Sequence, residues 1–253
     1  MKYYERLVEL GCFTRDDVHV LTGNYNTAGT LLKNYLKKGY IQQVKRNLYV
    51  AINLADYQPV VSKYNIATRI TGSAYVSHHA AFEYYGCANQ VSYQVEVSSK
   101  TPFAMFSFGG NNFAYFASRI DDGIITQPDG VRVTDMERTV IDGINDYEKI
   151  AGLEELLRCI EMIPSLQENK LISYLKSYGK KVLYQKTGYI LQHYKNMLNL
   201  SDSFFAECAA NIGKSTRYLD NSMDGNYMSQ WQLIAPPDLM KITNKGVDHF
   251  AEL

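Results

Sequence analysis

The stretch that decides the fold is Thr27–Ala51, which reads TAGTLLKNYLKKGYIQQVKRNLYVA. After a polar break at 23–26, its first part predicts a helix over residues 27–38, because apolar side chains recur at the spacing of one buried stripe. These side chains are Ala28, Leu31, Leu32, Tyr35 and Leu36. Two strands follow at 40–44 and 48–51, on either side of a basic turn. The stretch therefore predicts a helix followed by a hairpin with a basic tip.

Two shorter helices precede this stretch. Residues 3–10 form the first, which a glycine ends. Thr14 and Asp17 have the spacing of a capping box for a second helix over residues 15–21. Three helices and a hairpin in this order predict a winged helix-turn-helix DNA-binding domain at residues 1–55.

The polar face of the 27–38 helix is suited to DNA. In a winged helix the third helix enters the major groove, where Thr, Asn and Lys meet base edges, while positive charge at the wing meets phosphates. The predicted DNA-binding residues are Thr27, Thr30, Lys33, Asn34, Lys37, Lys38, Lys45 and Arg46. The alternative is an ordinary amphipathic helix with a solvated lysine face. The order and spacing of all four elements favour DNA binding.

Composition and charge agree with this division. The chain has 253 residues, 46% of them hydrophobic and 13% aromatic, which excludes a mainly disordered protein. It has no run of about 18 apolar residues and no apolar signal segment, so we expect a cytoplasmic protein without a membrane span. Net charge is zero, yet residues 1–50 carry eight Lys/Arg against four Asp/Glu. A basic N-terminal segment followed by an acidic remainder is typical of a nucleic-acid-binding protein that has a second partner.

Beyond a linker at 56–59, the pattern is mixed. The predicted elements are helices at 63–70 and 75–85, strands at 91–98, 103–108 and 112–118, and a strand pair around 127–130. Helices follow from Thr134, and Trp231 precedes a late strand at 233–237. The predicted fold class is α+β, with a winged helix-turn-helix before a larger mixed α/β domain at 60–253 that has an antiparallel sheet and C-terminal helices.

Several of these segments together resemble a known family. They are Leu31–Lys33 with Gly39–Ile41 and Lys45–Tyr49, Tyr75–Ala81 up to Gly86, Val133–Asp142, and Lys186–Leu191. The resemblance is to the AbiEi-type antitoxins of bacterial abortive-infection systems, which are type IV toxin-antitoxin systems, and it covers nearly the whole chain. The family usually has glycine where this chain has Asn47. Asparagine tolerates positive φ best among the other residues, so we expect the wing turn to survive.

The resemblance implies a function. Proteins of this family repress their own operon through the winged helix and counteract a co-encoded nucleotidyltransferase toxin through the C-terminal domain, without needing a stable toxin complex. A single winged helix has a small footprint, so we expect operator DNA with inverted repeats and two copies of a chain that is a monomer in solution. The alternative is a regulator without a toxin, whose C-terminal domain senses a ligand or partner.

The segment Glu137–Asp142 concentrates charge without indicating catalysis. Thr134 and Glu137 have capping-box spacing, as do Ser165 and Glu168 before the next helix. Arg138 and Asp142 lie one turn apart, where a surface ion pair contributes a few tenths of a kcal/mol. We expect a structural role for these residues and no catalytic residues in the chain.

Two other chemistries lack the residue patterns that they require. Gly72-Ser73 resembles the opening of a nucleotidyltransferase signature, but the carboxylate pair that would hold magnesium is missing, and adjacent Asp121 and Asp122 would point to opposite faces of a strand. His78 and His79 are neighbours whose side chains diverge, and the four dispersed cysteines lack zinc-site spacing. The sequence therefore predicts no metal site and no cofactor, and reduced, mostly buried thiols.

A second basic surface is predicted near residues 180–195. It consists of Lys180, Lys181, Lys186 and Lys195, interleaved with Tyr184, Tyr189 and Tyr194. This is a candidate antitoxin surface for RNA or a toxin. The alternative is a solvated helix face, which is the commoner reason for such a pattern.

Overall fold

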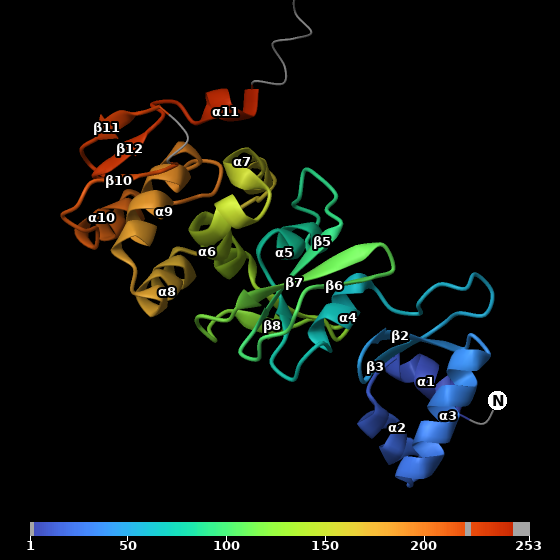
Figure 1. The fold of residues 1–253 in the computed structure, drawn as a ribbon. Helices are drawn as coiled ribbons and strands as arrows, with labels where there is room; N and C mark the ends of the chain where they lie inside the picture. Colours follow the sequence, from blue (N-terminus) through green and yellow to red (C-terminus); the bar gives the residue numbers. More distant parts are fainter. Residues whose placement is uncertain (1–2, 221–223, 245–253) are drawn as a thin grey trace, which may run out of the picture. The chain divides into compact units, whose positions relative to one another are not determined.

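The computed structural model describes residues 3–220 and 224–244 (Figure 1). The described residues divide into two compact units. The first takes residues from 1–76, 92–118 and 125–133, and the second takes residues from 77–91, 119–124 and 134–253. Helices and mixed sheets occur in both units, so the predicted α+β class is confirmed. The predicted division at residues 55–60 falls inside the first unit.

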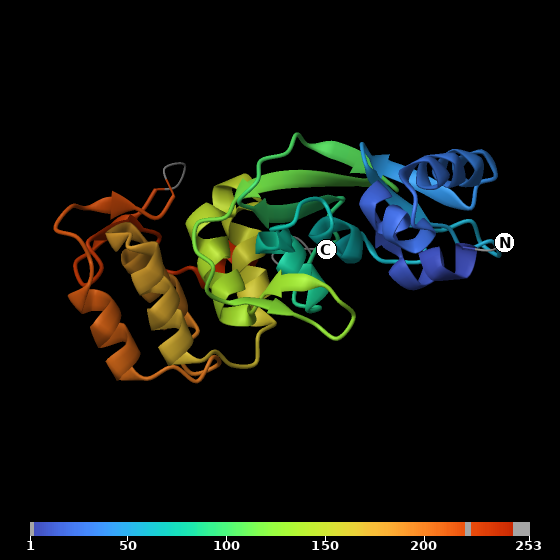
Figure 2. The ribbon, with the colours of Figure 1, turned by 90° about the horizontal axis from the view of Figure 1, so that it is seen from below.

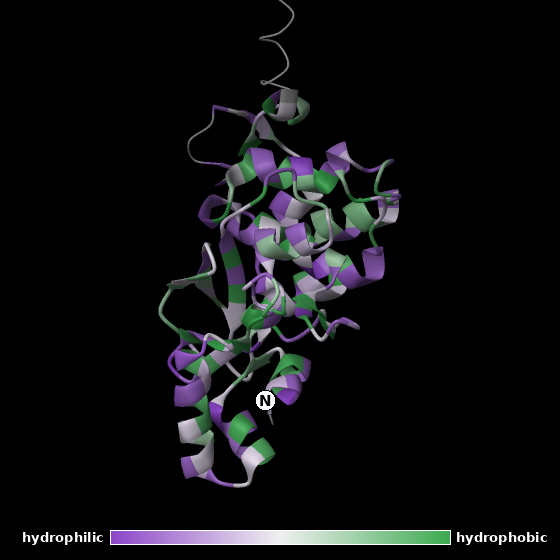
Figure 3. Ribbon diagram, turned by 90° about the vertical axis from the view of Figure 1, so that its right-hand side faces the viewer, coloured by the Kyte–Doolittle hydropathy of each residue, from purple (hydrophilic) through white to green (hydrophobic). Residues whose placement is uncertain are grey.

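The first unit opens with the predicted winged helix. Its elements are α1 (Tyr4–Leu10), β1 (Cys12–Phe13), α2 (Arg15–Thr22), α3 (Tyr25–Lys37), β2 (Ile41–Lys45) and β3 (Leu48–Ala51). The strands form an antiparallel sheet in the order β1-β3-β2. The buried side chains of these elements are Leu7, Phe13, Val18, Ala28, Leu31, Leu32, Ile41 and Ala51. Hydrophobic and hydrophilic residues alternate around the helices (Figure 3), as expected for elements that share one small core.

The start of α3 corrects the sequence prediction. The helix begins at Tyr25, two residues earlier than predicted, and residues 23–26 are only in part a break. Asn24 is the N-cap, and its side-chain oxygen accepts hydrogen bonds from the backbone N–H groups of Asn26 (2.8 Å) and Thr27 (3.1 Å). An asparagine cap satisfies two donors that the first turn leaves open, so the helix starts inside the polar run. The predicted Thr14–Asp17 capping box of α2 is confirmed.

A mixed sheet makes up much of the rest of the first unit. The elements after the winged helix are α4 (Lys63–Thr68), β4 (Tyr75–Val76), β5 (Gln94–Ser99), β6 (Phe106–Phe108), β7 (Asn111–Ala117), β8 (Ile124–Thr126) and β9 (Arg132–Thr134). The strand order is β6-β7-β5-β4-β9-β8. Neighbours β5 and β7 run parallel, whereas β6 with β7 and β4 with β5 run antiparallel. The Gly109-Gly110 turn between β6 and β7 has positive φ at both glycines, which a tight hairpin requires.

The predicted helix over residues 75–85 is wrong at its start. Tyr75 and Val76 form strand β4, and the helix α5 (His78–Tyr84) begins only after Ser77. A short apolar run fits either a buried strand or a helix, and here pairing with β5 and β9 decides for the strand. The 63–70 helix is two residues shorter than predicted, and the 103–108 strand is limited to 106–108.

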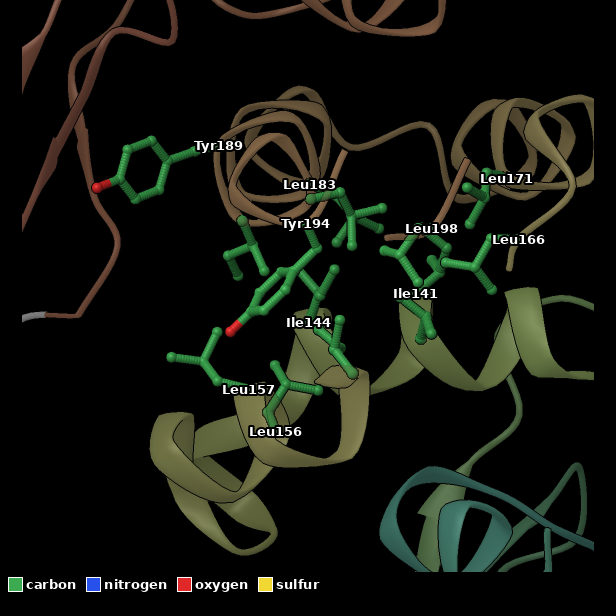
Figure 4. Packing of buried hydrophobic residues seen from close by; sticks show 14 of the residues in the cluster. Ile141, Ile144, Leu156, Leu157, Leu166, Leu171, Leu183, Tyr189, Tyr194 and Leu198 are labelled. Carbon is green, nitrogen blue, oxygen red and sulfur yellow. The ribbon is translucent and has the colours of Figure 1, made fainter. Parts of the chain in front are cut away.

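The second unit is mainly helical. After α5 it contains α6 (Met136–Asp146), a 3-10 turn (Tyr147–Lys149), α7 (Gly152–Glu161), α8 (Glu168–Tyr178), α9 (Lys181–His193), α10 (Asp202–Ala210), β10 (Arg217–Tyr218), β11 (Asn226–Met228), β12 (Leu233–Ala235) and α11 (Met240–Asn244). Strand β12 lies between β10 and β11 (Figure 1). Figure 2 shows these orange and red strands near the lighter orange helices of the same unit. The predicted late strand is thus confirmed. Figure 4 shows part of the core of this unit, in which Ile144 of α6, Leu157 of α7 and Tyr194, the C-cap of α9, point toward one another.

Two predicted capping boxes of this unit are wrong. Asp135, not Thr134, is the N-cap of α6, and its carboxylate accepts a hydrogen bond from the Arg138 N–H at 2.9 Å. Ser165 lies outside α8, whose N-cap Gln167 makes no side-chain capping bond. Glu137 and Glu168, each three residues after the predicted cap, instead accept hydrogen bonds from distant backbone N–H groups. Spacing along the chain does not reveal such partners.

All four cysteines are free and buried, as predicted. Burial raises the pKa of Cys12 and Cys208 to about 12, so both thiols stay protonated. Within residues 3–220 and 224–244, no helix combines the length and apolar character needed to cross a membrane.

Candidate nucleic-acid interface

Helix α3 presents one continuous polar face. Thr27, Thr30, Lys33, Asn34 and Lys37 are exposed on it, as is Lys38, which caps the helix. The 13 residues of α3 include no Asp or Glu. With about 100° per residue, the polar positions fall within roughly one third of the helix circumference, opposite the buried Ala28, Leu31 and Leu32. The face therefore has donors and positive charge in the arrangement that a major groove accommodates.

The earlier start of α3 adds a residue that sequence reasoning missed. Asn26 is exposed in the first turn, in line with Thr30, Lys33 and Lys37 at spacings of four, seven and eleven residues. In helix-turn-helix proteins the N-terminal residues of the recognition helix contact base edges. The sequence signal for this earlier helix start is Asn24, because asparagine is a preferred N-cap residue. Asn26 therefore joins the candidate residues.

Side chains from α2 hold α3 in place. The Arg15 guanidinium donates a hydrogen bond to the Tyr25 carbonyl at 3.2 Å and lies over the Tyr25 ring. Tyr25 also donates to Asp16 and stacks on His19 at 3.8 Å between ring centroids. These contacts fix the angle between the two helices, so α3 projects as one preformed surface.

The wing turn survives with asparagine in place of glycine. Asn47 has φ of 60°, the left-handed conformation that the turn needs. Its side-chain oxygen accepts a hydrogen bond from the backbone N–H of Arg15 at 3.1 Å. That N–H lies in the first turn of α2, where no intrahelical acceptor exists. Asparagine thus ties the wing to the helix-turn-helix, which glycine could not do.

The two basic residues of the wing are placed differently. Arg46 is exposed at the turn, where the sequence predicted a phosphate contact. Lys45 is half-buried, with its ammonium group 5.3 Å and 5.4 Å from the ring centroids of Phe103 and Phe106. Burial lowers the pKa of Lys45. Because its charge is already engaged by the rings of Phe103 and Phe106, Lys45 is the weaker candidate for a phosphate contact.

The four lysines of the predicted antitoxin surface have separate surroundings. Lys180 donates to Asn145 at 2.9 Å, Lys186 donates to the Tyr147 hydroxyl at 3.2 Å, and Lys195 pairs with Asp202 at 2.5 Å. Lys181, in the first turn of α9, is exposed. Lys195 lies two residues beyond the other end of this helix, which is about 18 Å long at a rise of 1.5 Å per residue. The structure does not bring these lysines together at one point.

The Glu137–Asp142 segment is a buried structural network. Arg138 is 1% exposed and its Nε donates to Asp142 at 2.7 Å, while Nη1 donates to the carbonyls of Ile120 and Asp122. The expected surface ion pair is therefore a fully buried one, and removal of one member alone would leave an uncompensated buried charge. Glu137 accepts a hydrogen bond from the Gln167 N–H at 2.9 Å, which joins α6 to the start of α8. The structural role expected for this segment agrees with these contacts.

His78 and His79 each face a different buried carboxylate. His78 Nε2 lies 3.6 Å from Asp146, and His79 Nε2 lies 3.0 Å from Glu155. The Cys159 thiol also lies near Glu155, so three potential metal ligands fall within 4.8 Å of one another. However, Oε1 of Glu155 already accepts hydrogen bonds from the backbone N–H groups of Asn89 (3.1 Å) and Gln90 (3.0 Å). Two fixed donors at the oxygen that a metal would need favour a hydrogen-bonding centre.

A protein of known structure has a fold similar to that of this chain. No protein-family model matches the sequence, and no curated protein matches it. The structure is similar to the crystal structure of the RV2827C protein from Mycobacterium tuberculosis, with a TM-score of 0.62 and 12% sequence identity. The alignment covers 98% of this chain and 95% of that chain. The similarity thus extends over both units and concerns the fold alone.

The hydrogen bonds of Glu155 predict how the free energy of unfolding depends on pH in acid. Burial alone would raise its pKa, but the hydrogen bonds from His79, Gln90 and Asn89 outweigh this and lower it. A carboxylate whose pKa is lower in the folded state stabilises the fold above its unfolded pKa of about 4.3, and this contribution is lost as pH falls through the folded value. We expect Glu155→Gln to reduce stability at pH 7 and to flatten the acid limb of the pH–stability curve. Urea titrations at several pH values measure both effects, and an unchanged acid limb would contradict the assignment.

Proposed function

We propose that this chain is a DNA-binding autorepressor and antitoxin of the cytoplasm. It binds operator DNA through α3 and the wing, and it counteracts a co-encoded nucleotidyltransferase toxin. The observation that carries the DNA-binding part is the exposed polar face of α3, free of acidic residues and held in place by Arg15. A helix-turn-helix of this composition matches the groove and the phosphates together.

The antitoxin part of the proposal rests on the resemblance in sequence. Three segments that carry it supply buried residues of the second unit, including Ala80, Ala81, Val140, Ile141, Ile190 and Leu191. Their burial supports a role in maintaining the fold, so any toxin-directed surface lies elsewhere. Lys181 is the most accessible member of the predicted surface and the first to replace in a toxin-rescue assay.

Replacing Lys33 or Arg46 by alanine tests the DNA-binding part. We expect either change to weaken binding of the full chain to DNA from upstream of its own gene. Each lost phosphate contact should also reduce the slope of log K against log salt by about one unit. Fluorescence anisotropy against scrambled DNA at several salt concentrations measures both effects.

A matched control is Lys214→Ala, which removes one exposed positive charge from the second unit. We expect it to leave the salt slope unchanged. If Lys33→Ala and Arg46→Ala behave like this control, α3 and the wing are not the DNA-binding surface.

A further inference from the structure

A hollow of about 440 Å³ lies in the second unit, lined by the C-terminal end of α9, by β11, by the turn that follows β11 and by Pro237. Aromatic and polar side chains line it, chiefly Tyr189, Gln192, His193, Tyr227 and Trp231. The volume is within the range of small-molecule sites. Its described lining includes no Lys, Arg, Asp or Glu, so a neutral group suits it better than a phosphate or a carboxylate.

Trp231 is held rigidly at this hollow. Its indole lies directly on Gly188 of α9, where a Cβ atom would come within 2.1 Å of the ring. The buried Gln185 amide donates hydrogen bonds to the carbonyls of Trp231 and Gln232, both at 3.0 Å. Tyr189 packs edge-on against His193, with 4.9 Å between ring centroids. Burial raises the pKa of Tyr189 to about 12, so its hydroxyl stays neutral and donates to the Pro236 carbonyl.

Two neighbouring side chains present a fixed donor and a fixed acceptor. The Trp231 indole N–H donates to Oε1 of Gln192 at 2.8 Å. Since an indole N–H can only donate, the amide oxygen must face it, and the amide NH₂ is left to act as a donor. His193 Nδ1 lies 2.9 Å from the Tyr189 carbonyl, which can only accept. Nδ1 therefore carries a proton, and this tautomer leaves Nε2 as the acceptor.

We propose that this hollow binds a nucleobase. A planar heterocycle would stack on the exposed rings of Tyr227 and His193, above the buried Trp231, while its edge, an acceptor beside a donor, pairs with Gln192 and His193. Base stacking on aromatic rings tolerates any base, and purines offer the larger ring surface. The base belongs either to a free nucleoside or nucleotide or to a single-stranded nucleic acid. This proposal is independent of DNA binding by the first unit.

The only tryptophan of the chain reports on this site. Adenosine is titrated into the full chain while Trp231 fluorescence is followed, with excitation at the red edge of the indole band to avoid absorption by the base. We expect saturable quenching by adenosine, and little effect of ribose 5-phosphate or inorganic phosphate. Equal affinities for adenosine, AMP and oligoadenylate indicate a site for free nucleosides, whereas tighter binding of the oligonucleotide indicates a single strand.

Two variants and a control decide the outcome. Gln192→Glu keeps an acceptor for the Trp231 indole but removes the amide donor, and we expect at least tenfold weaker binding. Tyr227→Ala removes a ring that is 56% exposed, so it should weaken binding without affecting the fold. Gln58→Glu makes the same chemical change at an exposed position of the first unit and should bind as the unaltered chain does. Absence of saturable quenching, or equal quenching in all three variants, would overturn the proposal.

Discussion

Replacing Arg138 by methionine is expected to lower the free energy of unfolding by about 3–5 kcal/mol. The guanidinium is buried and pairs with Asp142, which is also 1% exposed. It further donates hydrogen bonds to the carbonyls of Ile120 at 3.2 Å and Asp122 at 2.6 Å. Methionine fills much of the volume but leaves one buried carboxylate and two carbonyls without these donors. Urea titration followed by Trp231 fluorescence measures the change in the second unit.

The matched control is the double variant Arg138→Met with Asp142→Leu. Replacing both members of a buried ion pair by apolar residues is often neutral or stabilising, because neither charge is left alone. Tyr178 donates its hydroxyl hydrogen to Asp142 and would lose this partner, so we expect partial recovery. A double variant less stable than Arg138→Met alone would show that the carboxylate matters for reasons other than this pair.

Gly188→Ala is expected to destabilise the second unit by roughly 1–3 kcal/mol, the usual cost of overpacking a core. The added Cβ would lie 2.1 Å from the Trp231 ring, which cannot move aside as a flexible side chain can. Alanine favours a helix over glycine by about 1 kcal/mol, so the clash must first exceed this gain. Chemical denaturation followed by far-UV circular dichroism measures the net effect.

Two comparisons separate the clash from the helix propensity. Gly29→Ala makes the same change inside α3, where the nearest atom is the movable end of Arg15 at 3.2 Å, and it should be neutral or stabilising. In a Trp231→Leu background, Gly188→Ala should cost far less than in the unaltered chain. Equal costs in both backgrounds would exclude the indole as the reason for glycine at this position.

The winged helix could be predicted because its signals are local. Apolar spacing, the Thr14 cap and the glycines act within a few residues, and the predicted elements match the observed ones to within two residues. Where the prediction is wrong, tertiary contacts determine the local structure. Tyr75 and Val76 become a strand because β5 and β9 pair with them. Glu137 binds a backbone N–H thirty residues away, which no spacing rule indicates.

The candidate sites show the same division. The polar face of α3 follows from helical periodicity alone. The partial burial of Lys45 depends on Phe103 and Phe106, which are distant in sequence and meet it only in the folded first unit. The hollow around Trp231 joins residues of α9 to residues some forty positions later. In the sequence, Tyr189 and Trp231 belong to separate segments, and only the fold places them at the same hollow.

The division of the chain into interleaved units has a consequence for its biosynthesis. The first unit contains residues 92–118 and 125–133, so it cannot be completed until residue 133 has left the ribosome. At about 5–20 residues per second, synthesis of residues 92–133 takes roughly 2–8 s. The winged-helix core, by contrast, is composed of residues up to Ala51 and can close much earlier. A nascent chain can therefore close the core around α3 well before the rest of the first unit is complete.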